Sequence, residues 1–184
     1  MAHKNTTSVA YSVTRKTYYT PLSSESVISN LYTSIGPSSY WKWPSIAENI
    51  TLYNESSKEE FIKEVEAAIR PEGFMNFGTM IEGATVFNVD SDSHLGLKLM
   101  MLDNTLIAIT MLPQSRRSLN AELFVPVEML VRELPGKEGT EILWQFPSTM
   151  IAWVDDGNQG LLAAAKVLDK KLKGLVDVIG EYCK

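Results

Sequence analysis

Glu128 and Arg132 stand in an otherwise largely apolar stretch, and their side chains could do chemistry together. In a strand over 124–133, alternate side chains point to opposite faces, so both residues share a face with Phe124, Pro126 and Leu130. A carboxylate and a guanidinium amid apolar groups could line a pocket and polarise a carbonyl group. The alternative is a cross-strand or same-strand ion pair on a half-exposed sheet or dimer face. The sequence leaves both interpretations open.

His94 ends a short polar run in which Asp90 and Asp92 occupy alternate positions. Oxygen and imidazole ligands spaced in this way can converge on a metal ion. Because no partner ligands are evident elsewhere, we expect no metal and favour a solvated turn. His94 is the stronger candidate for acid–base chemistry, since imidazole titrates near neutral pH.

Aromatic side chains form a second group of candidates, as the walls of an apolar ligand site. Trp and Tyr combine a large apolar ring with a hydrogen-bond donor that can orient a ligand. We favour the alternative that such residues fill the core beneath a long connection. The candidate substrate-binding residues are Trp41, Trp43, Phe124 and Trp144.

Motifs and composition argue against several classes of protein. The sequence contains no Gly-x-Gly-x-x-Gly after a strand, no P-loop, no Gly-x-Ser-x-Gly and no His-Glu-x-x-His, so we expect no cofactor. A net charge of −5 without a basic stripe argues against a nucleic-acid partner. The single cysteine, Cys183, permits no internal disulfide bond.

The chain carries no signal that predicts a membrane or an export pathway. Residues 1–20 lack the apolar centre of a signal peptide, and no run approaches the ~20 apolar residues that span a bilayer. We therefore expect a cytoplasmic protein with no membrane partner. With 184 residues, we predict a disordered tail over 1–7 and a single α+β domain over 8–184.

Hydrophobic periodicity predicts the elements that would position these side chains. Helices are expected from Ser23 or Ser24 to 35, around Ile46 and Ile50, after a capping box at Ser57 and Glu60, and after residue 158. Strands are expected near 8–20, 74–81, 84–89, 95–102, 105–112, 124–133 and 140–147. Residues 106–112 are apolar on both faces, which places them centrally in the sheet. This pattern predicts an antiparallel sheet with helices packed on one face.

Several segments resemble a known family. Residues 106–112 (LIAITML) and 123–131 (LFVPVEMLV) are similar to the fungal branch of domain-of-unknown-function family 302, and the similarity runs over roughly residues 20–180. The resemblance implies a two-layer β-α-β-β-β-β-α arrangement like the TATA-binding-protein fold, often as a dimer. It also implies a setting in natural-product biosynthesis, with an apolar metabolite as ligand.

The sequence departs from the family pattern in two places. Many members carry an Asp-His pair where this chain has Ile81 and Glu82, and Gly-Asn-Pro where it has Asp103-Asn104-Thr105. If the Asp-His pair does chemistry in relatives, this chain has either lost that role or moved it to Glu82.

Our leading hypothesis from the sequence is a cofactor-independent protein that binds a hydrophobic small molecule, such as a secondary-metabolite intermediate. It would cyclise, isomerise or dehydrate this molecule by confining a reactive conformer in an apolar pocket. The candidate catalytic residues are Glu128, Arg132, His94 and Glu82. The rival hypothesis is a non-catalytic ligand-binding or dimerisation module that uses the open sheet face between two copies.

Overall fold

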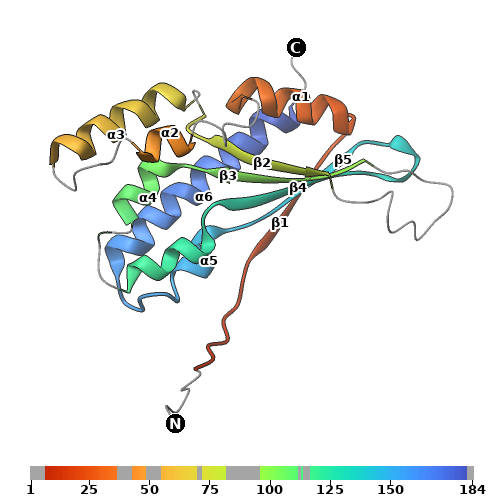
Figure 1. Cartoon of the computed structure of the whole chain (residues 1–184). Helices are drawn as coiled ribbons and strands as arrows, with labels where there is room; N and C mark the ends of the chain where they lie inside the picture. The colour runs from red at the N-terminus through yellow and green to blue at the C-terminus, as the bar shows by residue number, and fades with distance from the viewer. Residues whose placement is uncertain are drawn as a thin grey trace, which may run out of the picture.

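A five-stranded antiparallel sheet, in the order β1-β5-β4-β3-β2, forms the centre of the molecule (Figure 1). The computed structural model describes residues 7–36, 43–48, 55–69, 72–81, 96–111, 113 and 117–181. The strands are β1 (Arg15–Thr20), β2 (Met75–Ile81), β3 (Leu97–Asp103), β4 (Val127–Glu133) and β5 (Thr140–Gln145). The strand predicted over 84–89 lies outside these ranges. Of the disordered tail predicted over 1–7, only residue 7 is described.

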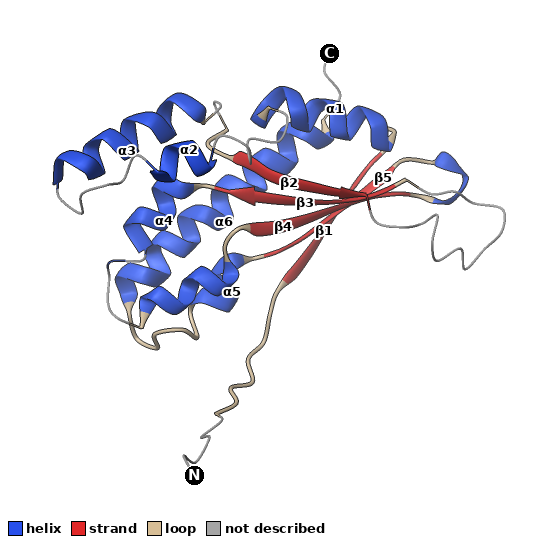
Figure 2. Cartoon of the chain, in the orientation of Figure 1, coloured by secondary structure: helices blue, strands red, loops and turns tan. Residues whose placement is uncertain are grey.

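Two helices cover one face of the sheet, α1 (Ser24–Ile35) and the long C-terminal α6 (Gln159–Gly180) (Figure 2). The remaining helices are α2 (Trp43–Glu48), α3 (Glu55–Ala68), α4 (Thr105–Met111) and α5 (Pro147–Ile151), with 3₁₀ turns η3 (Ser118–Phe124) and η4 (Pro135–Lys137). The predicted α+β class, with an antiparallel sheet, packed helices and a long C-terminal helix, is confirmed.

Local sequence signals set the starts of both covering helices. The side chain of Ser23 accepts a hydrogen bond from the backbone N–H of Ser26 at 3.2 Å, and this N-cap begins α1. Asn158 does the same for α6, accepting from the N–H of Leu161 at 3.0 Å. Both helices therefore begin where the sequence predicts.

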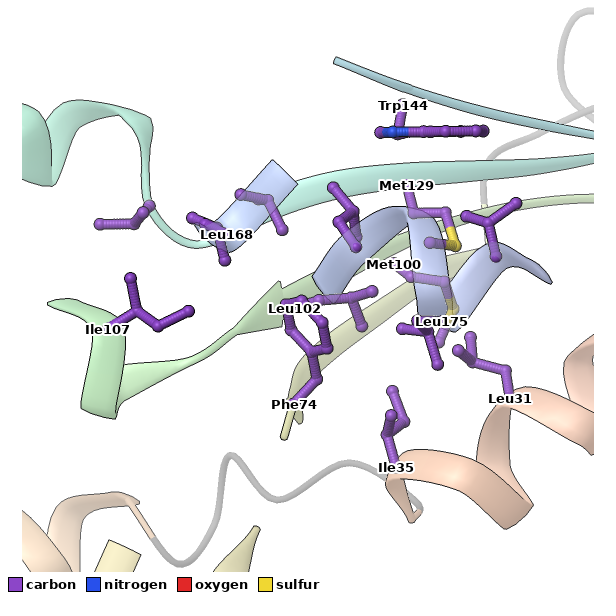
Figure 3. Close-up of a cluster of buried hydrophobic side chains, with 14 of the residues drawn as sticks. Leu31, Ile35, Phe74, Met100, Leu102, Ile107, Met129, Trp144, Leu168 and Leu175 are labelled. Carbon is purple, nitrogen blue, oxygen red and sulfur yellow. The ribbon is translucent and has the colours of Figure 1, made fainter. Parts of the chain in front are cut away.

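The main core lies between the sheet and these two helices (Figure 3). On β4, alternate side chains Val127, Met129 and Val131 are 4%, 0% and 1% exposed. Met100 lies beside Met129 on the neighbouring strand, and both belong to one buried cluster with Leu175 of α6. The predicted apolar face of this strand is thus confirmed.

A smaller cluster lies at the β2 edge of the sheet, beneath α2 and α3. Ile46, Val65 and Met75 are buried there, and Phe61 and Leu106 pack against them. Successive residues of an extended chain point to opposite sides, so Phe74 joins the main core while Met75 joins this second cluster.

The central strand predicted over 105–112 is wrong, because Thr105–Met111 forms the helix α4. Its start is fixed by Asn104, whose Oδ1 accepts from the N–H of Ile107 at 3.0 Å. Ile107 is in the main core, whereas Leu106 packs against the second cluster. A helix between two clusters is apolar nearly all round, which in so short a segment looks like a buried strand.

Three predicted boundaries also need correction. The first strand begins at Arg15, because its partner β5 ends at Gln145 and Pro147 starts a helix. The strand predicted from Phe124 begins at Val127, after the η3 turn. Helix α3 already begins at Glu55, so Ser57 lies in its first turn and is not its N-cap.

Candidate functional site

The side of β4 that faces away from α1 and α6 carries Glu128, Leu130 and Arg132 in that order. Glu128 and Arg132 are exposed, and Leu130 between them is half-buried. In the parts of the sheet that the structure describes, no helix packs over the centre of this side, which we call the open face.

An apolar row crosses the open face at its centre. Leu130 of β4 pairs with Leu99 of β3 on one side and with Leu143 of β5 on the other, and all three are half-buried. A shallow hollow of about 220 Å³ lies over this row, with Glu128 and Arg15 also on its border. On β4 the open face is therefore apolar in the middle and charged at both ends, while β3 places the apolar Leu97 and Met101 beside Arg132 and Glu128.

Arg132 forms an ion pair with Glu141, the residue directly opposite it on β5. Both Nε and Nη2 of Arg132 donate to the same carboxylate oxygen of Glu141, the Nε bond at 3.0 Å. The Glu141 side chain is 10% exposed and that of Arg132 is 49% exposed. Since a buried carboxylate is costly without a cation, this geometry fits the cross-strand ion pair that the sequence left open.

Glu128 has no hydrogen bond or ion pair with any residue that the structure describes, and it is not paired with Arg132. Its side chain borders the hollow over Leu130 and a second one of about 190 Å³, where Phe124 and Met150 also lie. An exposed carboxylate beside these two hollows is free to meet a cation from outside the chain.

Trp144 and Phe124 serve mainly as core residues. Trp144 lies opposite Met129 on the covered side of the sheet and is 6% exposed, although it also borders the hollow over Leu130. Its indole N–H has no hydrogen-bond partner in the described parts of the chain. Phe124, in η3, packs against the main core and lies edge-on to Tyr11, with ring centroids 6.0 Å apart.

The other predicted site residues cannot be placed. Glu82, His94 and Trp41 lie outside the described residues, as do Asp90 and Asp92. Trp43 is the first residue of α2, but its side chain is not described. Their predicted roles remain predictions. Among the described residues, no group of three or more potential metal ligands occurs.

Comparison with known proteins gives one decisive match. The family model named "Domain of unknown function DUF302" matches residues 50–179. The chain belongs to the DUF302 family. No curated protein matches the chain.

A crystal structure with a similar fold is known for an uncharacterised conserved DUF302 protein from Bacillus stearothermophilus. The two chains superpose with a TM-score of 0.57 at 16% sequence identity, over 91% of this chain and 98% of the other. At this identity the similarity shows a shared fold and carries no information about function.

Sequence reasoning missed two polar residues of this DUF302 chain, Asp103 and Asn104, at the end of β3. Burial raises the pKa of Asp103 to about 6, although a hydrogen bond from the Thr105 hydroxyl to its carboxylate lowers it. Asn104 is 3% exposed and joins the start of α4 to the turn at Gly73. The only signal in the sequence was the departure from the family pattern at Asp103-Asn104-Thr105.

In the described ranges of this DUF302 protein, every helix is too short or too polar to cross a lipid bilayer.

Proposed function

We propose that this DUF302 protein is a binding module that self-associates through its open face. The observation that carries the proposal is the order of side chains on β4, where an acid, an apolar residue and a base follow one another as Glu128, Leu130 and Arg132. Apolar surface bordered by charged groups is typical of protein–protein interfaces.

Two copies of this face are complementary in one orientation. If β4 packs antiparallel to the β4 strand of a second copy about a two-fold axis, Glu128 lies over the partner's Arg132 and Leu130 lies over the partner's Leu130. The parallel orientation instead places each acid over an acid and each base over a base. Charge therefore selects the antiparallel dimer.

Neighbouring strands fit the same arrangement. Arg15 and Tyr19 lie four residues apart on the same side of β1, as Glu128 and Arg132 do on β4. The same two-fold axis brings Arg15 over the partner's exposed Tyr19, where a cation–π contact can form. Because stacked sheets cross at about 30°, the contacts will be closest near the central strand β4.

The shape of the open face favours a binding module over a self-contained enzyme. Pockets for small molecules usually enclose about 300–1,000 Å³, whereas the hollow over Leu130 holds about 220 Å³. Arg132, one of the proposed catalytic residues, already neutralises Glu141. Both observations argue against catalysis by confinement of a small molecule on this face.

A hydrophobic small molecule is the second candidate occupant of the open face. The apolar side chains around the hollow support it, and so does the resemblance to the fungal branch of the family, which implies a natural-product intermediate. In that case Glu128 and Arg132 would orient the ligand, in a cyclase, isomerase or dehydratase or in a binding protein without catalysis.

Analytical ultracentrifugation over a range of protein concentrations tests the primary proposal. The wild-type protein should sediment as a dimer, and Leu130→Lys should make it a monomer because two ammonium groups would meet in the apolar row. Val167→Lys, at a position that is 50% exposed on α6 on the other side of the sheet, is the matched control and should leave the dimer intact.

Charge reversal tests the orientation. Glu128→Arg and Arg132→Glu should each weaken the homodimer, whereas an equimolar mixture of the two variants should form a heterodimer in which both contacts are restored. Circular dichroism checks that Arg132→Glu, which places an acid beside Glu141, still folds. A wild-type monomer at all concentrations would refute the proposal, and loss of apolar-dye binding in Leu130→Lys would then support the small-molecule alternative.

A further inference from the structure

A larger hollow, of about 510 Å³, lies away from the open face. It is bordered by α3, by the turn at Gly73, by the start of α4 and by α6. Three apolar side chains line it, those of Ile69, Leu106 and Ile107. Its volume falls in the range of about 300–1,000 Å³ in which small-molecule pockets are usually found.

One side of this hollow carries two nitrogen donors that converge above Gly73. A Cβ atom at Gly73 would lie 2.7 Å from Nζ of Lys171 and 3.1 Å from Nδ2 of Asn104. Gly73 also has a φ of +78°, a conformation that other residues rarely adopt. The glycine thus leaves the ammonium and the amide open toward the hollow.

Both donors can form further hydrogen bonds. Asn104 is almost fully buried, and it uses Oδ1 to accept from Ile107 and one N–H of Nδ2 to donate to the carbonyl of Gly73. The second N–H of this amide has no acceptor among the residues that the structure describes, and Lys171 has no ion pair there. A buried donor without an acceptor is unfavourable, and a bound carboxylate would satisfy it.

The same hollow also carries a carboxylate. Glu66 of α3 lines it together with Lys171 of α6, yet the two side chains form no ion pair in the described structure. Opposite charges that share one hollow without contact leave space for a ligand that carries both complementary charges.

We propose that this hollow binds a small amphoteric molecule with an apolar body, the chemistry of an apolar α-amino acid. The ligand carboxylate would accept from Lys171 and Asn104, and its ammonium group would face Glu66. Its apolar side chain would pack against Ile69, Leu106 and Ile107. This site shares no residue with the open face, so its test does not depend on whether the protein self-associates.

Three matched probes test the assignment by isothermal titration calorimetry: leucine, 4-methylpentanoate, which lacks the amine, and 3-methylbutylamine, which lacks the carboxylate. Leucine should bind most tightly. Lys171→Gln should weaken leucine and 4-methylpentanoate by about tenfold or more, since each loses a charge-assisted hydrogen bond. Lys170→Gln, an exposed neighbour on the same helix that does not border the hollow, is the control.

Glu66→Gln separates the two charges of the ligand. It should weaken leucine to about the affinity of 4-methylpentanoate and leave 4-methylpentanoate itself unchanged. The proposal is overturned if none of the probes binds, if Lys171→Gln binds leucine as the wild type does, or if 4-methylpentanoate binds as tightly as leucine in the wild-type protein.

Discussion

The two sides of strand β4 are built from the same seven residues but have different neighbours. Val127, Met129 and Val131 lie under α1 and α6 and are almost completely buried, whereas Glu128 and Arg132 on the other side are exposed. The covered side carries three apolar residues and ends at the buried Glu133, whereas the open face alternates acid, apolar residue and base. Substitutions on the first side should therefore change stability, and substitutions on the second should mainly change association.

The end of the open face at β3 is itself informative. Asp103 follows Leu99 and Met101 at alternate positions of β3, so the strand turns it toward the open face. It pairs with Met75, which is buried in the second cluster under α2 and α3. The open face therefore ends at Asp103, and the burial that raises the pKa of this residue to about 6 marks that end.

The largest effect is expected at the centre of the covered side. Met129→Ala should lower the free energy of unfolding by about 2–5 kcal/mol, because it leaves a cavity among side chains that are packed on all sides. Leu130→Ala, the next residue on the open face, is the matched control and should cost less than about 1.5 kcal/mol in the monomer. Urea unfolding of both variants measures the difference, and equal losses would show that the open face is also covered.

The next largest effect is expected at Asp103, where the open face ends. The pKa of Asp103 in the folded protein, about 6, lies above the value near 3.9 of an unfolded chain. The folded state therefore binds the proton more tightly, and this residue lowers stability as pH rises from about 4 to 6. Asp103→Asn should stabilise the protein by about 3 kcal/mol at pH 7 and by almost nothing near pH 3. An unchanged pH dependence of urea unfolding would contradict this burial.

A smaller loss is expected when the ion pair of the open face is broken. Arg132→Ala leaves the buried carboxylate of Glu141 without its cation and should cost about 1–2 kcal/mol. The double variant Arg132→Ala/Glu141→Gln should recover part of this loss, since no buried charge then remains unpaired. If Arg132→Ala unfolds at the wild-type urea concentration, the pair does not contribute to stability.

The smallest effect on stability is expected at Glu128. Glu128→Gln should change the free energy of unfolding by less than about 0.5 kcal/mol, because its side chain has no partner among the described residues. The same change should weaken the proposed dimer, since it removes the acid that faces the partner's Arg132. A marked loss of stability in the monomeric state would show that Glu128 has a structural role inside the chain.

The sequence by itself determined the elements that depend on neighbouring residues along the chain. Ser23 and Asn158 mark the starts of α1 and α6 by their side-chain hydrogen bonds to the backbone. The buried stripe of α6 and the alternation on β4 follow from the fixed periods of helix and strand. These features need no knowledge of what packs against them.

Only the tertiary structure decided features that depend on residues distant in sequence. Residues 105–111 form a helix because two clusters cover it from opposite sides, a fact that its own apolar pattern does not encode. Arg132 contacts Glu141 because of the register between β4 and β5. Lys171 reaches Gly73 and Asn104 only because α6 packs against this end of the sheet. Side-chain periodicity fixes which residues share a face, but the packing of the whole chain fixes what that face meets.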